Sequence, residues 1–157
     1  MYYFEFSYPD GTVSENFILE KYRDFFMSYS ENKYIWTKSH TTLASRYFSE
    51  NRKIISTLFF SHHSEQGTFS LLYSHGSSGF YSLGDKDKMD QLIDLDGQLD
   101  LIFVGACIPP EKAFLAIEDF AKNPLEPSER IDWINAKDID MTEKYRLLGL
   151  DDLEDLD

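Results

Sequence analysis

Alternating apolar and polar positions predict a series of short β-strands. In the first of them, Tyr2, Phe4, Phe6 and Tyr8 occupy every second position, so one side of the strand is aromatic. The apolar run at 101–108 is typical of a strand that is buried on both faces, and we expect it to be the central strand. Strands are expected at residues 2–8, 53–62, 68–74, 80–83, 89–95 and 101–108, with turns at 9–11, 64–67, 76–79 and 96–97.

Apolar residues at helical spacing predict two longer helices and two short ones. The clearest helix begins near Pro110, whose missing N–H costs nothing in a first turn, and it ends at Asn123-Pro124. Its apolar stripe consists of Ala113, Phe114, Ala116, Ile117 and Phe120. An earlier helix begins at Leu19 and ends near residues 30–32, with a stripe made of Leu19, Tyr22, Phe25, Phe26 and Tyr29. Short helices are expected at 41–49 and 141–150.

Two segments allow alternative assignments. Residues 12–17 fit either a second hairpin strand or the start of a helix capped by Ser14. Residues 33–37 fit either a short strand or an aromatic loop. Together the elements predict one α+β domain over residues 1–149, in which a mostly antiparallel β-sheet has flanking helices, and an acidic C-terminal tail at 150–157. Residues 131–134 are expected to form a short strand, and we expect Trp133 and Phe120 to pack against residues 101–108.

The charge of the chain narrows the choice of partner. Its 157 residues include 15 Lys and Arg against 28 Asp and Glu, which gives a formal net charge of −13. Such a chain repels nucleic-acid phosphates and anionic membranes, and it attracts a basic partner. We therefore expect no direct nucleic-acid binding and no membrane association. The N-terminus lacks the features of a signal peptide, and no apolar run is long enough to span a bilayer, so we expect a cytoplasmic protein.

Residue types that often carry catalysis do not assemble into a known motif. His62 and His63 are adjacent and would face opposite sides of a strand, so we expect them, like His75, to be surface turn residues. The Gly76–Gly79 turn is not followed by Lys-Ser/Thr or by a helix, so it fails as a phosphate loop. The single cysteine, Cys107, lies in an apolar run and is expected to be a small buried hydrophobe. We therefore expect a protein that is not an enzyme and has no metal or cofactor.

Acidic residues gather around the turns between 85 and 100 and again in the tail. This stretch does not supply the central glycine and the closing glutamate of a twelve-residue calcium loop in register, so calcium binding is disfavoured. A solvated acidic face and a docking face for a basic partner both fit the pattern. On the second interpretation, the candidate binding residues are Asp85, Asp87, Asp90, Asp94, Asp96, Asp100, Asp151, Asp152, Glu154 and Asp155.

The second half of the chain resembles the Imm-one family of bacterial immunity proteins, which belong to polymorphic toxin systems. The matching positions are Ile108, Pro109, Glu111, Ala113, Ala116, Ile117, Phe120, Pro127, Ile131 and Trp133. The resemblance implies an immunity protein that neutralises a cognate toxin domain by stoichiometric binding, as in contact-dependent growth inhibition. The toxin would be basic, with nucleases and deaminases among the candidates. Two alternatives remain open: an acidic adaptor or regulatory domain without a toxin, and a small hydrolase.

Overall fold

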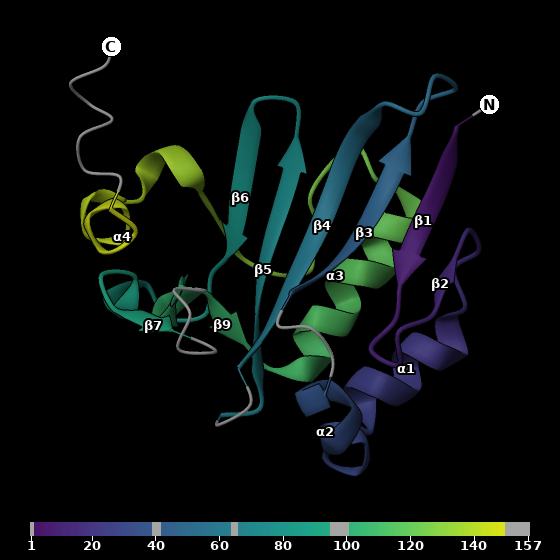
Figure 1. The fold of residues 1–157 in the computed structure, drawn as a ribbon, viewed down its shortest axis with the longest axis horizontal. Helices are drawn as coiled ribbons and strands as arrows, with labels where there is room; N and C mark the ends of the chain where they lie inside the picture. The colour runs from purple at the N-terminus through teal and green to yellow at the C-terminus, as the bar shows by residue number, and fades with distance from the viewer. Residues whose placement is uncertain (1, 39–41, 64–65, 95–100, 150–157) are drawn as a thin grey trace.

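The computed structural model describes residues 2–38, 42–63, 66–94 and 101–149, and it has the α+β architecture that the sequence predicts. The main sheet, antiparallel throughout these residues, has the strand order β10-β6-β5-β4-β3-β1-β2, and β9 also pairs with β5 (Figure 1). Its strands are β1 (Tyr3–Ser7), β2 (Val13–Ser14), β3 (Thr42–Phe48), β4 (Ile54–His63), β5 (Thr68–His75), β6 (Ser78–Ser82), β9 (Cys107–Ile108) and β10 (Trp133–Asn135). A separate pair is formed by β7 (Leu92–Asp94) and β8 (Leu101–Phe103).

The helices are divided between one face and one end of the main sheet. Helices α1, α2 and α3 pack on one face, with α3 behind the central strands in Figure 1. The short α4 lies at the end of the sheet near β7 (Figure 1). The helices are α1 (Leu19–Met27), α2 (Tyr29–Lys38), α3 (Pro110–Lys122) and α4 (Thr142–Leu147), with 3₁₀ turns η1 (Lys86–Lys88), η2 (Val104–Ala106) and η3 (Ala136–Asp138). Among the described residues, no helix combines the length and apolar character needed to cross a membrane.

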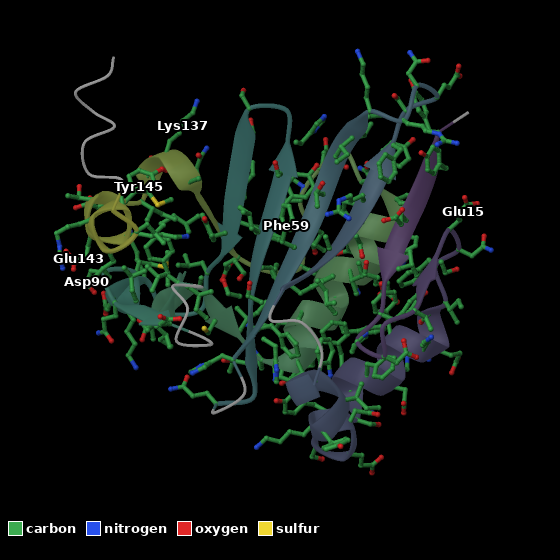
Figure 2. All side chains as sticks on the ribbon, viewed as in Figure 1. Glu15, Phe59, Asp90, Lys137, Glu143 and Tyr145 are labelled. Carbon is green, nitrogen blue, oxygen red and sulfur yellow. The ribbon has the colours of Figure 1, made fainter. Side chains whose placement is uncertain are left out.

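The pair β4–β5 decides which residues enter the core. The two strands pair continuously from Ser56↔His75 to His63↔Thr68, and successive side chains point to opposite faces. Phe60 and Leu71 therefore pack under the helices, each at most 2% exposed. Phe59 stands on the uncovered face and is half-buried (Figure 2). One face of the sheet thus forms the main core, and the other carries a smaller cluster around Phe103 and Tyr81 and is open beside it.

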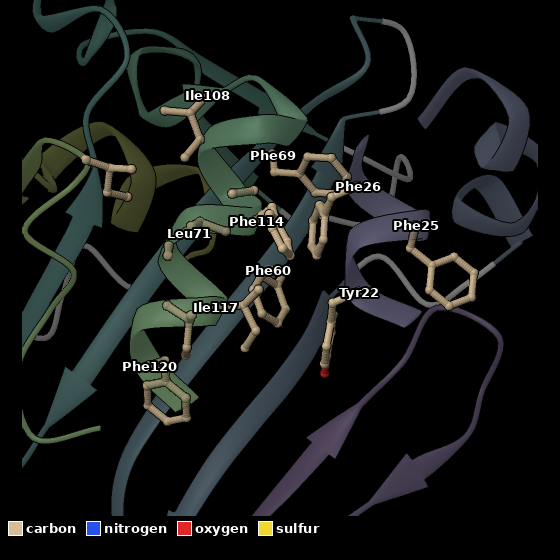
Figure 3. Packing of buried hydrophobic residues seen from close by; sticks show 14 of the residues in the cluster. Tyr22, Phe25, Phe26, Phe60, Phe69, Leu71, Ile108, Phe114, Ile117 and Phe120 are labelled. Atoms are coloured by element: carbon tan, nitrogen blue, oxygen red, sulfur yellow. The ribbon is translucent and has the colours of Figure 1, made fainter. Parts of the chain in front are cut away.

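Aromatic rings fill the space between the main sheet and its helices (Figure 3). Phe69 of β5 is fully buried, with its ring centroid 4.6 Å from that of Trp36 and 5.2 Å from that of Phe26. Two polar groups in this region are hydrogen-bonded: the Trp36 indole donates to the Phe25 carbonyl (2.8 Å) and the Tyr22 hydroxyl to the Ser7 carbonyl (2.7 Å). These bonds remove most of the cost of burying an indole N–H and a phenol.

Two elements predicted from the sequence are wrong, because in each of them a buried residue obscures the pattern of apolar and polar positions. Residues 33–37 are neither a strand nor a loop but the second half of α2, in which Trp36 is buried. The helix expected at 41–49 is the strand β3. Ser45 is fully buried on the core face of β3, so a polar residue breaks the alternation that would have indicated a strand.

The prediction that residues 101–108 form the central strand is also wrong. Residues 101–108 form β8, the turn η2 and the two-residue β9, because the chain bends at Val104–Ala106. The centre of the sheet is β4–β5. Phe120 and Trp133, which we expected to pack against residues 101–108, both have ring centroids 6.4 Å from that of Tyr73 on β5. For the ambiguous residues 12–17, the structure has the hairpin strand β2.

We expect Phe69→Ala to lower the free energy of unfolding by about 3–5 kcal/mol, because it removes a fully buried ring from a packed aromatic cluster. Trp133→Ala should cost less, because Trp133 is only half-buried. Met27→Ala is the control, since Met27 is 56% exposed and should change stability by no more than about 0.5 kcal/mol. Urea unfolding measures all three, and equal stabilities of the Phe69 and Met27 variants would contradict this core.

Candidate functional site

The acidic loop after β6 is exposed, as the sequence predicts for Asp85, Asp87 and Asp90. Asp85 caps η1, because its carboxylate accepts a hydrogen bond from the Asp87 backbone N–H (3.0 Å). Asp94 lies apart from this loop, half-buried on β7. The other predicted binding residues fall outside the described part of the chain: Asp96, Asp100, Asp151, Asp152, Glu154 and Asp155.

Backbone groups hold this loop in place. The N–H groups of Gly84 and Asp85 both donate to the Gly105 carbonyl, at 2.8 and 2.9 Å, and Val104 N–H donates to the Gln91 carbonyl (2.9 Å). The contact is so close that a Cβ on Gly105 would lie 2.3 Å from the Asp85 carbonyl oxygen. The loop is therefore clamped to η2 through main-chain atoms, and its carboxylates remain turned to solvent.

A second acidic segment, at η3 and α4, faces the loop. Asp138, Asp140 and Glu143 are all exposed. Hydrogen bonds from the side chain and backbone N–H of Thr142 lower the pKa of Asp140, and the bond from Arg146 lowers that of Glu143. Both carboxylates are therefore ionised at neutral pH.

The two segments enclose a hollow of about 380 Å³, which we call the acidic hollow. Five exposed carboxylates and one lysine line it, together with three apolar side chains that are less exposed. Asp90 and Glu143, from the two segments, lie next to each other in Figure 2. The lining residues are Lys86, Asp87, Met89, Asp90, Ile134, Asp138, Ile139, Asp140 and Glu143.

The acidic hollow suits a cationic side chain better than a metal ion. Nowhere in the described residues do three His, Cys, Asp or Glu side chains come close enough to hold a metal ion. The carboxylates instead share the lining with the apolar side chains of Met89, Ile134 and Ile139. An inserted lysine or arginine would place its aliphatic stem on these apolar side chains and its charge among the carboxylates.

Another hollow, of about 350 Å³, lies between α3 and residues 123–130 and is less suited to this role. Its Arg130 is bound to Asp119 and Glu118, each at 2.6 Å. These ion pairs fasten the loop to α3. The cationic group is thus supplied from within the chain, and the charges of this hollow are mixed.

Sequence reasoning located one wall of the acidic hollow and missed the other. Asp138, Asp140 and Glu143 were not among the predicted residues. A weak signal was present, because Asp138 and Asp140 repeat the Asp-x-Asp spacing of Asp85 and Asp87 beside a turn. What brings the walls together is the pairing of β10 with β6, which the sequence alone did not indicate.

The histidine prediction is wrong for the adjacent pair, because His62 and His63 are only 7% and 5% exposed. The Nε2 atom of His62 lies 2.5 Å from the Tyr29 hydroxyl, and its ring packs on Trp36 and Phe69. Burial, with a smaller contribution from His63, lowers the pKa of His62 to about 4. His62 is therefore a neutral part of the core at pH 7.

The two other candidates for a catalytic role are His75 and Cys107. His75 Nδ1 lies 3.0 Å from the Leu125 carbonyl, so it serves as a donor to that oxygen. Cys107 is half-buried, and burial raises the pKa of its thiol. A raised pKa keeps a thiol protonated, which lowers its reactivity as a nucleophile.

In comparisons with known proteins, no family model, curated protein or solved structure matches this chain.

We expect acid to destabilise the protein partly through His62. Its pKa is about 4 when folded and near 6.5 when unfolded, so the unfolded chain binds the proton more tightly. The stabilisation is complete above about pH 6.5 and is lost as the pH falls toward 4. Between pH 7 and 4.5, unfolding free energies of wild type should fall more steeply than those of His62→Gln, by up to about 1.4 kcal/mol per pH unit. Carboxylates titrate in both proteins, so parallel curves would show that His62 does not contribute.

Gly105→Ala should displace the acidic loop, because the new Cβ meets backbone atoms of Asp85 and Met89 at 2.3 and 2.7 Å. We expect a loss of about 1–3 kcal/mol in stability and faster hydrogen exchange at the Gly84 and Asp85 amides. Gly79→Ala is the control, since its Cβ would have only ordinary contacts, at 3.6 Å or more. Unchanged exchange in the Gly105 variant would mean that the clamp does not hold the loop.

Proposed function

We propose that this chain is an immunity protein that binds and neutralises the toxin domain of a contact-dependent growth inhibition or related polymorphic toxin system. It acts by stoichiometric protein–protein binding, which covers the active site or the substrate groove of the toxin. The resemblance of residues 108–133 to the Imm-one family motivates the proposal. The charge of the molecule and the geometry of the acidic hollow support it.

The observation that carries the proposal is the acidic hollow. Two segments far apart in the sequence bring five carboxylates and one lysine around one depression, and of these carboxylates Glu143 is also paired with Arg146. Like charges repel, so solubility alone would be served better by spreading them over the surface. Their concentration is favourable when a cationic partner binds, because each inserted lysine or arginine then meets several carboxylates.

The same charges suit a toxin that acts on nucleic acid. A nuclease or deaminase holds its substrate's phosphates with basic residues. An acidic protein with a net charge of −13 is attracted to such a groove from a distance and competes there with the substrate. The immunity protein then needs no catalytic group of its own.

The decisive experiment is co-expression with the toxin domain encoded immediately upstream of the gene. We expect the wild-type protein to restore growth and to form a one-to-one complex with that domain. A set of substitutions in the acidic hollow, Asp87→Asn, Asp90→Asn, Asp138→Asn and Glu143→Gln, should lower the association rate constant at least about tenfold in 10 mM salt. The difference should shrink at 150 mM salt, where charges are screened within about 8 Å. Asp85 and Asp140 are left unchanged, because both carboxylates cap backbone N–H groups.

A matched control removes the same number of exposed carboxylates elsewhere, namely Glu15→Gln, Glu126→Gln, Glu129→Gln and Asp132→Asn. Glu15 lies at the opposite end of the molecule from Asp90 and Glu143 (Figure 2). Both variants have the same net charge, so only the position of the charges differs. Equal association rates for the two variants would reject the acidic hollow as the docking surface. Absence of any complex with the wild-type protein would reject the immunity function itself.

A further inference from the structure

The open face of the main sheet carries a second hollow, of about 200 Å³, which we call the sheet-face pocket. Strands β4, β5 and β6 supply one side of it, and β8 and α4 supply the other. Most of its lining is apolar, and its polar members are two serines, one tyrosine and one lysine. The lining residues are Phe59, Ser61, Ser70, Leu72, Tyr81, Leu101, Ile102 and Lys144.

The sheet-face pocket and the acidic hollow are neighbours. Glu143 lines the acidic hollow, and the next residue, Lys144, lines the pocket. The cross-strand partners Ile134 and Tyr81 are divided in the same way, with Ile134 in the hollow and Tyr81 in the pocket. The two depressions are thus adjacent on the surface. A partner that covers about 800 Å² of surface, as in a standard interface, would extend over both.

The size of the sheet-face pocket limits its occupant. Sites for drug-sized ligands usually enclose about 300–1,000 Å³, which is more than this pocket offers. A volume of about 200 Å³ is that of one large side chain. Pockets of this kind, rimmed by residues that exclude water, hold the anchor residues of protein–protein interfaces.

The charge of the pocket selects the chemistry of that side chain. The ammonium group of Lys144 lies 5.3 Å from the centroid of the Phe103 ring and 6.0 Å from that of Tyr81. A positive charge at this position disfavours an incoming lysine or arginine and is compatible with an aromatic ring. The hydroxyl of Ser70 can hydrogen-bond to a polar tip such as a phenol or an indole N–H. The two depressions therefore favour different side chains, cationic in the acidic hollow and aromatic in the pocket.

We infer that the sheet-face pocket receives one aromatic side chain, tyrosine or tryptophan, from the same toxin domain whose basic residues enter the acidic hollow. This inference rests on the proposed function. Electrostatic attraction brings the partner to the hollow and orients it, which sets the association rate. Burial of the ring in the pocket then slows dissociation, because leaving exposes its apolar surface to water again.

The test fills the pocket and measures binding to the purified, catalytically inactive toxin domain that is encoded upstream. Leu72→Trp adds a ring at the pocket wall, on a strand where aromatic residues are well accepted. We expect the dissociation constant to rise at least tenfold, mainly through faster dissociation, by the same factor in 10 and 150 mM salt. Ser74→Trp is the matched control, because Ser74 lies on the same strand and face but does not line the pocket. It should bind within twofold of wild type.

Two further measurements guard against a folding defect in the Leu72→Trp variant. Leu72→Ala, which removes a wall of the pocket instead of filling it, should also weaken binding. In the wild-type complex, the methyl resonances of Leu72, Leu101 and Ile102 should shift when the toxin domain is added.

The outcomes separate this inference from the proposed function. Wild-type affinity in both folded Leu72 variants, with unshifted methyl resonances, overturns the inference while the immunity function stands. A pocket that proves to hold a second copy of this chain, with dimerisation lost in Leu72→Trp, also overturns it. No complex with the wild-type protein rejects the proposed function and this inference together.

Discussion

The two-residue alternation of side chains along β4 and β5 is the constraint on which the rest of the structure depends. Because the strands pair over their whole shared length, Phe60 and Leu71 must enter the core when Phe59 and Leu72 do not. A shift of one residue in the pairing would exchange the two sets. The helices α1, α2 and α3 pack on the face that carries Phe60 and Leu71, and the opposite face carries only the smaller cluster around Phe103 and Tyr81.

Sequence periodicity predicted the elements in which large apolar residues dominate the inward positions. Helix α3 and the strands β4 and β5 follow from their spacing, and their bounds differ from the prediction by one or two residues. It failed for β3 and for residues 33–37. Ser45 lies against the Tyr22 hydroxyl at 3.5 Å, a contact between distant residues that no local pattern contains. Trp36 is buried from a helix whose other face is exposed, so its neighbours suggested a different element.

The acidic hollow was only half predictable for a similar reason. The turn residues near Asp85 and Asp87 are enough to predict an exposed acidic loop from the local sequence. The opposite wall depends on β10 pairing with β6, which places Ile134 beside Tyr81 and so brings η3 and α4 next to η1. A charged residue in a loop looks the same in sequence whether it stands alone or faces four others. Only the tertiary structure distinguishes the two cases.

The backbone clamp between the acidic loop and Gly105 has a consequence for how such a site can diversify. The bonds from Gly84 and Asp85 to Gly105 use main-chain atoms, so the exposed side chains at Asp87 and Asp90 have no part in holding the loop. Those positions can accumulate substitutions without repacking the interior, provided that the glycines are kept. The same backbone can therefore carry different side chains around the acidic hollow. Its binding preference can then change without a change in stability.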